Sequence, residues 1–139
     1  MARKPTILCV DNMEEHLRIR VLLLQQFGCE TLTAPDHTTA IRIAAENAID
    51  LVLIDYHLAN GETGEQVARD VRVLKPHVPL VMLTGDVHLP GRACQCVDAV
   101  LTKGLSSPTE LFDVIQRLLP EAELRPRRAM LIPQPSPTP

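Results

Sequence analysis

Residues 50–64 read Asp50-Leu-Val-Leu-Ile-Asp55-Tyr-His-Leu-Ala-Asn-Gly-Glu-Thr-Gly64. Four consecutive large apolar residues lie between two aspartates, whereas a strand buried on one face only would alternate apolar with polar residues. The run predicts a strand at residues 51–55 that is buried on both faces, and Asp55 stands where this strand ends. In open parallel α/β sheets the carboxyl ends of the strands are where ligands and chemistry collect.

Three other apolar runs also lead into polar residues. Residues 6–10 precede Asp11-Asn12, residues 79–84 end on Thr84, and residues 99–102 precede Lys103. A fifth run, residues 30–34, is short and alternates weakly, as is typical of an edge strand. The sequence therefore predicts five strands, four of which deliver polar side chains to their carboxyl ends.

Segments with apolar residues at helical spacing separate these strands. Helices are expected at residues 14–27, after an N-cap at Asp36, after the glycine-marked loop and at 88–97. A last helix is expected from Ser107, where Pro108 and Glu110 complete a start signal, to near Pro120. Their apolar stripes are Leu17, Val21 and Leu24; Ala40, Ile41, Ala44, Ala45 and Ala48; Val67, Val71 and Leu74; and Leu111, Val114, Ile115 and Leu118.

Five strands alternating with five helices predict an α/β fold, a doubly wound five-stranded parallel sheet with helices on both faces. The expected strand order, 2-1-3-4-5, would bring Asp11, Asn12 and Asp55 together at a topological switch point, with Thr84 and Lys103 beside them. We expect one domain at residues 5–119, followed by a proline-rich tail at 120–139 that is extended or disordered.

Composition excludes two classes of partner. The net charge of -3 and the three aromatic residues, Phe27, Tyr56 and Phe112, offer neither a basic surface nor stacking platforms for nucleic acid. No apolar run approaches the ~20 residues that a membrane span requires, so membrane insertion is not expected.

The four cysteines are expected to be reduced thiols in a cytoplasmic protein. The first residues lead directly into a strand-like run with no signal-peptide pattern. Cys94-x-Cys96 lacks a second pair at the spacing of a zinc site.

A carboxylate at the end of a buried strand, such as Asp55, can act as a nucleophile toward phosphorus and form an acyl phosphate. That chemistry needs a hard cation, a hydroxyl donor and a fixed positive charge. Mg²⁺ suits the first need, because Asp11 and Asp55 supply carboxylates and the backbone carbonyl of His57 supplies a further oxygen. Thr84 offers the hydroxyl, and Lys103 offers the charge.

With these residues in this order, the chain resembles the receiver domain of two-component response regulators over about residues 5–119. The residues that carry the resemblance are Val10-Asp11-Asn12, Ile54-Asp55, Leu83-Thr84-Gly85 and Thr102-Lys103. The resemblance implies that Asp55 accepts a phosphoryl group from a sensor histidine kinase or a phosphotransfer protein. It also implies that Asp11, Asn12, Asp55 and the His57 carbonyl bind Mg²⁺, and that Thr84 and Lys103 detect the phosphate.

By the same resemblance the protein is a single-domain response regulator in a phosphorelay and not an enzyme. It would signal through contacts with a downstream protein that the sequence does not identify.

Three residues depart from the family pattern. Asn12 stands where a carboxylate usually binds Mg²⁺, and the loss of a unit charge about 4 Å from the ion removes about 4 kcal/mol of attraction for each unit charge of the ion, at an effective dielectric near 20. Asn12 could instead close an Asx turn at the start of the next helix. Gly104 replaces the usual proline, and Val100 replaces the aromatic residue that often acts as a rotating switch.

Two alternatives follow from these residues. A degenerate receiver would act as a phosphorylation-independent binding module. A hydrolase of the haloacid-dehalogenase type also uses a strand-end aspartate, but it would need an aspartate two residues further on, where this chain has His57.

Overall fold

The computed structural model describes residues 4–85, 91, 95–103 and 107–125. Five strands form one parallel sheet in the order β2-β1-β3-β4-β5, which confirms the predicted α/β fold and its topology. The strands are β1 (Thr6–Val10), β2 (Glu30–Ala34), β3 (Leu51–Asp55), β4 (Leu80–Thr84) and β5 (Ala99–Thr102).

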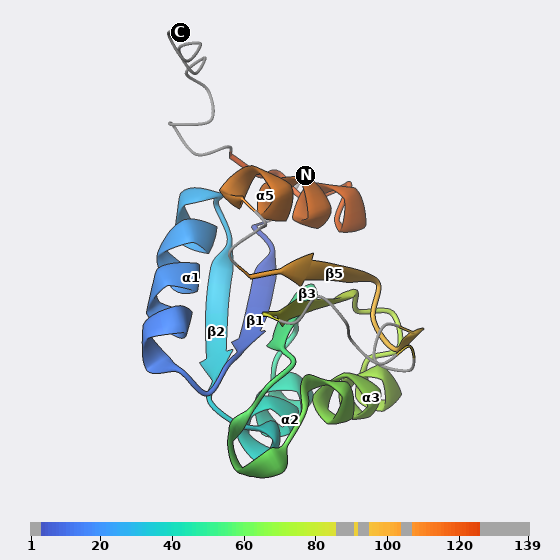
Figure 1. Cartoon of the computed structure of the whole chain (residues 1–139). Helices are drawn as coiled ribbons and strands as arrows, with labels where there is room; N and C mark the ends of the chain where they lie inside the picture. The colour runs from blue at the N-terminus through green and yellow to red at the C-terminus, as the bar shows by residue number, and fades with distance from the viewer. Residues whose placement is uncertain (1–3, 86–90, 92–94, 104–106, 126–139) are drawn as a thin grey trace, which may run out of the picture.

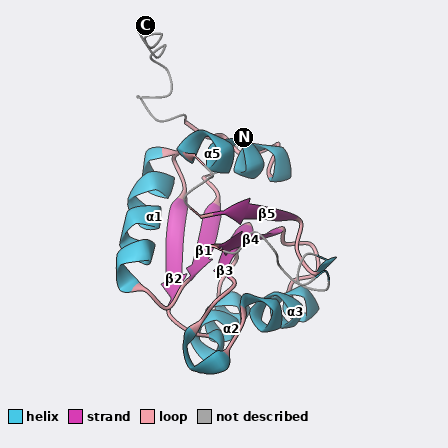
Figure 2. Cartoon of the chain, in the orientation of Figure 1, coloured by secondary structure: helices cyan, strands magenta, loops and turns pink. Residues whose placement is uncertain are grey.

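Helices cover both faces of this sheet, as Figures 1 and 2 show: α1 and α5 lie on one side of the strands, and α2 and α3 lie on the other. They are α1 (Glu14–Gln26), α2 (His37–Glu46), α3 (Gly64–Leu74) and α5 (Pro108–Leu118), with a short 3-10 turn, η1 (Ala59–Gly61), before α3. The helix predicted at 88–97 lies largely outside the described residues. Within the described ranges, none of the helices is both long and apolar enough to cross a membrane.

The core has two layers because successive side chains of each strand point to opposite faces of the sheet. In β1, Ile7 and Cys9 pack in one layer with side chains of α1 and α5, whereas Leu8 and Val10 pack in the other with side chains of α2 and α3. All five residues of β3 are buried, as the unbroken apolar run predicts. The strand that carries Asp55 is therefore fixed from both sides.

Three residues of the predicted helical stripes are exposed. Ala45 and Ala48 are exposed because α2 presents Ala40 and Ala44 to the sheet and ends at Glu46. Leu74 is 43% exposed as the last residue of α3. Helical spacing alone therefore does not place a residue in the core. The residue must also lie on the part of the helix that contacts the sheet.

Both predicted N-caps are present. The Asp36 carboxylate accepts a hydrogen bond from the Thr39 N–H at 2.8 Å, and the Ser107 hydroxyl accepts one from the Glu110 N–H at 3.3 Å. Pro108 is the first residue of α5.

The described chain continues to contact the domain beyond residue 119. Leu124 packs against the layer under α1 and α5, and the Arg125 N–H donates to the Phe27 carbonyl at 2.7 Å. The rest of the predicted tail, residues 126–139, lies outside the described residues, so its conformation stays a prediction.

Candidate functional site

The carboxyl ends of the central strands meet at one edge of the sheet. The Tyr56 N–H donates to the Leu83 carbonyl at 2.9 Å, and the Lys103 N–H donates to the Thr84 carbonyl at 2.6 Å. These bonds continue the ladder one residue past the strands. They hold the residues that follow β3 and β5 in register with the end of β4.

Three of the predicted site residues contact one another at this edge. Lys103 Nζ lies 2.9 Å from Asp55 Oδ2 and 3.4 Å from Asp11 Oδ2. Asp11 is fully buried and Asp55 is 4% exposed, so the two carboxylates share one ammonium group away from bulk water. Thr84, 1% exposed, ends β4, the strand that pairs with β3 on one side and β5 on the other.

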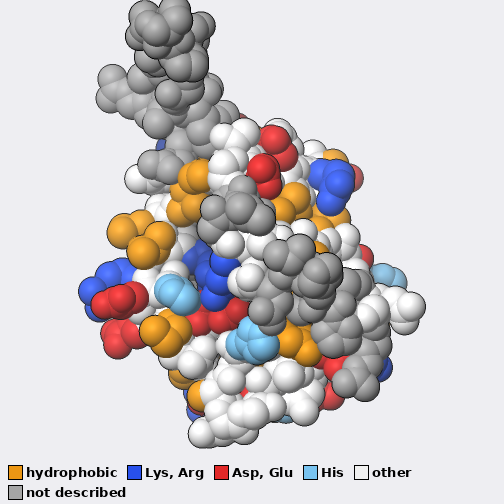
Figure 3. All heavy atoms as spheres, in the orientation of Figure 1, with side chains coloured by type: hydrophobic (Ala, Val, Ile, Leu, Met, Phe, Trp, Pro, Cys, Tyr) orange, Lys and Arg blue, Asp and Glu red, His pale blue; other side chains and the backbone are white. Residues whose placement is uncertain are grey.

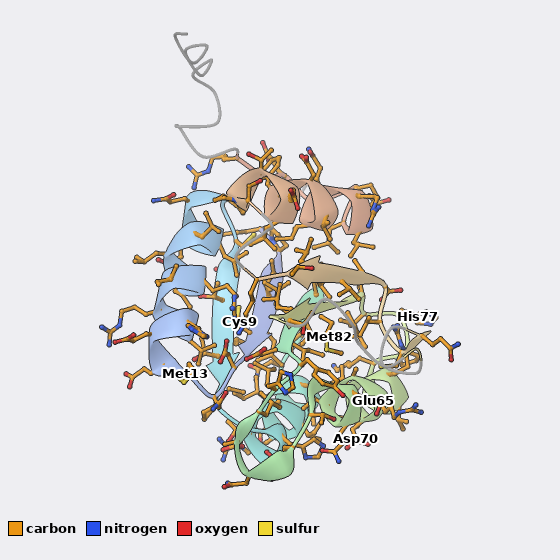
Figure 4. All side chains as sticks on the ribbon, viewed as in Figure 1. Cys9, Met13, Glu65, Asp70, His77 and Met82 are labelled. Atoms are coloured by element: carbon orange, nitrogen blue, oxygen red, sulfur yellow. The ribbon has the colours of Figure 1, made fainter. Side chains whose placement is uncertain are left out.

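The other two predicted residues, Asn12 and His57, have exposed side chains. His57 pairs with Thr63 in an isolated antiparallel bridge, and its predicted role is confined to its backbone carbonyl. The turn before α1 is closed by Asp11, whose Oδ1 accepts the Met13 N–H at 2.9 Å, and Figure 4 shows Met13 at the start of that helix. An Asx turn at the start of this helix was one expectation for Asn12, and the structure shows it at Asp11.

Two site residues on α1 were missed from the sequence. His16 Nδ1 and Arg20 NH1 each lie 3.2 Å from Asp11 Oδ2. Their spacing of four residues places both on one side of α1, which is a signal that the sequence does contain. The spacing does not show that this side faces the cluster, because the apolar stripe that starts at Leu17 identifies only the side of α1 that packs on the sheet.

Burial and neighbouring charges move the two carboxyl groups in opposite directions. Burial raises the pKa of Asp55, the Lys103 hydrogen bond opposes this rise, and the nearby Asp11 carboxylate adds to it, so that the pKa lies above the ordinary 3.8. Burial also acts to raise the pKa of Asp11. There the Met13 N–H and the charges of Lys103 and Arg20 outweigh burial and hold the pKa below 3.8. Asp11 is thus the more firmly ionised carboxylate.

The cluster offers ligands for a metal ion. One atom from each of Asp11, His16 and Asp55 lies within 4.8 Å of the others. Figure 3 shows acidic, basic and histidine side chains gathered near the middle of the face that it presents. Two buried carboxylates fit the preference of Mg²⁺ for oxygen ligands, although three basic groups already contact Asp11 Oδ2.

The start of α3 lies directly against the end of β3. The Gly64 N–H donates to the Tyr56 carbonyl at 2.7 Å, and a Cβ at Gly64 would meet the Asp55 carbonyl at 2.5 Å and Ile54 Cγ2 at 2.9 Å. Only glycine permits this approach without displacing the backbone. The loop after Asp55 is thereby closed against β3.

A cavity of about 340 Å³ opens beside the cluster, between α1 and the β5–α5 region. Arg20 and Lys103 line its polar part, and Leu23, Leu101 and Leu111 are among its apolar wall residues. Arg20 and Lys103 therefore line this cavity and also contact Asp11.

Comparison with known proteins places this geometry in a family. The family model of the response regulator receiver domain matches residues 7–117. The sensor histidine kinase RcsC of Salmonella typhi is 31% identical over 117 residues, which are 84% of this chain and 12% of RcsC. The autoinducer 1 sensor kinase/phosphatase LuxN of Vibrio campbellii is 27% identical over 109 residues, which are 78% of this chain and 12% of LuxN. The chain thus spans about an eighth of the length of these relatives.

Solved structures have the same fold. A CheY-like receiver domain protein from Methanospirillum hungatei JF-1 superposes with a TM-score of 0.79 at 23% identity, covering 86% of this chain and 96% of its own. The response regulator TrrA from Thermotoga maritima, in complex with Mg²⁺-BeF, gives a TM-score of 0.76 at 26% identity, covering 83% of this chain and 99% of its own. The family match, the topology and the strand-end cluster agree, and the chain belongs to the response regulator receiver domain family.

Proposed function

We propose that this receiver domain is a phosphorylation-dependent switch in which Asp55 accepts a phosphoryl group. The observation that carries the proposal is the pairing of Asp55 with Lys103 at 2.9 Å, at a strand end where Asp11 lies beside them. The phosphoryl donor would be a sensor histidine kinase or a phosphotransfer protein. The relatives named sensor kinases support this choice of donor.

The proposed chemistry follows from the side chains. A carboxylate oxygen of Asp55 attacks phosphorus, a P–O bond forms as the P–N bond of a phosphohistidine breaks, and the leaving imidazole nitrogen takes up a proton. Lys103, which contacts Asp55, would then pair with the phosphoryl oxygens. Thr84 would donate its hydroxyl to one of them, as its place at the end of β4 allows.

Asp11, Asp55 and the His57 carbonyl are the oxygen donors that we propose for Mg²⁺, with Asn12 as a weaker ligand. When bound, the ion offsets negative charge on the carboxylates and the phosphoryl group. Asp11 is suited to this role because its depressed pKa keeps it ionised.

Phosphorylation would shift the face formed around β5 and α5 and change its affinity for a downstream protein, as expected for a two-state element biased by local charge. Signalling through a protein contact in the cytoplasm, rather than catalysis on a small-molecule substrate, is part of the proposal. Val100 on β5 is 39% exposed and takes the place of an aromatic switch, so the shift would not depend on a rotating ring.

Intact-mass analysis after incubation with acetyl phosphate and Mg²⁺ tests the acceptor role. The wild-type chain is expected to gain one phosphoryl group, and Asp55→Asn is expected to gain none. Asp113→Asn changes an exposed aspartate on α5 and serves as the matched control, which should still form the adduct. An adduct that persists in Asp55→Asn would contradict the proposal.

The alternative is a binding module that works without phosphorylation. Asn12 and the contact of Arg20 with Asp11 favour it, because both reduce the net negative charge available to a metal ion. Gly104, the third departure from the family pattern, lies outside the described residues. Failure of the wild-type chain to form an adduct with acetyl phosphate and with a cognate kinase would support this alternative.

A further inference from the structure

Arg20 reaches the acidic cluster from midway along α1. Its side chain is only 11% exposed, and NH1 lies 3.2 Å from Oδ2 of the buried Asp11. It lines the same cavity as Leu23 and Leu111. A long cationic side chain that is nearly buried and ends on a buried carboxylate is held in position, unlike a solvated surface arginine.

The contacts around the cluster balance its charge without a metal ion. Asp11 and Asp55 carry the two negative charges, Lys103 contacts both of them, and Arg20 supplies a second permanent positive charge at Asp11. Asn12 adds no further carboxylate. A divalent cation arriving at Asp11 would meet a guanidinium already on the same oxygen, and like charges at such distances repel strongly in a buried site.

We propose that Arg20 competes with Mg²⁺ for Asp11 and thereby sets the metal affinity of this receiver. The inference rests on the metal site of the proposed function. In the metal-free protein the guanidinium neutralises Asp11, and Mg²⁺ binds only as far as it displaces Arg20 from Oδ2. Arg20 acts through Asp11, and is therefore a positioning residue for the metal ligand rather than a catalytic one.

Of the three basic residues that contact Asp11, Arg20 is the one whose removal tests competition with Mg²⁺ separately from other roles. Lys103 also contacts Asp55, so its substitution would disturb the proposed acceptor directly. His16 is 42% exposed and is charged only when protonated. A guanidinium group is a permanent positive charge, and that of Arg20 pairs with Asp11.

Calorimetric titration with MgCl₂, without any phosphoryl donor, tests the inference on the full chain. Arg20→Gln is expected to bind Mg²⁺ at least tenfold more tightly than wild type, because it removes a unit positive charge beside Asp11. Arg18→Gln is the matched control: it removes the same charge from the same helix, but Arg18 is 70% exposed and pairs with Glu14 at 3.6 Å. Its affinity should stay within about twofold of wild type, because exposed charges are screened.

An Arg20→Gln protein that binds Mg²⁺ no more tightly than wild type, or no more tightly than Arg18→Gln, would overturn the inference. Arg20→Lys is expected to have a Mg²⁺ affinity between those of wild type and Arg20→Gln, since it keeps the positive charge and loses the two-pronged donor geometry of the guanidinium. Circular dichroism before each titration establishes that the variants are folded.

The wild-type chain supplies a second readout that needs no substitution. The Met13 amide, which donates to Asp11 Oδ1, and the Arg20 side-chain N–H signals can be followed by ¹⁵N NMR during a Mg²⁺ titration. Competition predicts that the Met13 and Arg20 signals shift along the same binding curve, while the Arg18 side-chain signal stays constant. A Met13 shift with unchanged Arg20 signals would contradict competition.

These measurements separate this inference from the proposed function. If Asp55 is phosphorylated but Arg20→Gln leaves the Mg²⁺ affinity unchanged, the inference fails and the acceptor role stands. If neither wild type nor Arg20→Gln binds Mg²⁺, the inference and the proposed metal site fail together, and the mass measurement on Asp55 still decides the acceptor role.

Discussion

Asp11 links the site to the helix that follows it. One carboxylate oxygen accepts the Met13 N–H just before α1, and the other contacts Arg20 within α1 and Lys103 after β5. The same carboxylate therefore fixes the start of a helix and balances the charges of the cluster. Any change at Asp11 is expected to alter both local structure and charge, which makes Asp55 the cleaner position for testing function.

Burial also suppresses the reactivity of two thiols, and this gives a pH prediction. Burial raises the pKa of Cys9 to about 12 and that of Cys29 to about 11, from an ordinary 9.0. Because the thiolate is the reactive form, we expect both residues to resist a thiol reagent at about pH 8 in the native protein and to react in urea. Peptide mass mapping measures which cysteines carry the label, and labelling of Cys9 in the folded chain would contradict the prediction.

The same shifts predict how stability changes in alkali. The folded chain keeps thiol protons that the unfolded chain releases above pH 9.0, so the free energy of unfolding should decrease as pH rises from about 9 toward 11. Urea unfolding at a series of pH values measures the slope. Cys29→Ala should show a smaller decrease than wild type, and an equal slope would assign the effect to other groups.

The positions of the strand-end residues were predictable at the residue scale, but the contribution of α1 to the cluster was not. Asp11, Asp55, Thr84 and Lys103 could be placed at one sheet edge because an apolar run ending on a polar residue marks a strand end. Arg20 could be placed on a helix but not over the cluster. The spacing of four residues from His16 separates Arg20 from the exposed Arg18, but whether that side of α1 faces the cluster depends on how α1 packs on the sheet.

At the scale of elements, the contact between α3 and β3 fixes the loop that follows Asp55. Gly64 begins α3 and lies so close to the end of β3 that no side chain fits between them. The loop is closed by the bridge between His57 and Thr63. The position of the proposed acceptor therefore depends on a glycine nine residues further along the chain.

Gly64→Ala is expected to destabilise the fold by about 2 kcal/mol or more, because the new Cβ would overlap the Asp55 carbonyl oxygen and force the helix or the strand end to move. Urea unfolding measures the loss. Gly85→Ala is the matched control, since a Cβ at Gly85 meets nothing within 4 Å. Equal stability of the two variants would show that the α3–β3 contact is looser than described.

The strands were easier to predict than the buried faces of the helices. The bounds predicted at residues 6–10, 30–34, 51–55 and 99–102 agree with the structure, and the strand predicted at 79–84 begins one residue later, at Leu80. Ala48 and Leu74 were assigned to the core by spacing alone and are exposed, because tertiary packing decides which part of each helical stripe meets the sheet.

At the scale of the whole molecule, two core layers hold the central strands while the residues of the candidate site gather at the edge of the sheet. The layer under α1 and α5 is completed by Leu119 and Leu124, which follow the last helix. The Arg125 N–H then bonds to the Phe27 carbonyl at the end of α1. Residues just beyond the predicted domain end therefore contribute to the packing of the helix that carries Arg20.

Truncation tests this contribution. A chain ending at residue 119 is expected to lose about 1–2 kcal/mol of unfolding free energy relative to one ending at 125, because it lacks the partly buried Leu124 and the Arg125 hydrogen bond. Urea unfolding of both chains measures the difference. Identical stabilities would place the domain end at residue 119, as the sequence predicted.

The proposed acceptor role of Asp55 can be tested most directly by chemical mapping. After phosphorylation, borohydride reduces an acyl phosphate to an alcohol and releases phosphate, so a phosphorylated aspartate becomes homoserine. Peptide mass spectrometry of the reduced wild-type chain should find homoserine at position 55 and only there, and only in samples that received the phosphoryl donor. Homoserine at position 11, or none in a chain that has gained a phosphoryl group, would contradict the account.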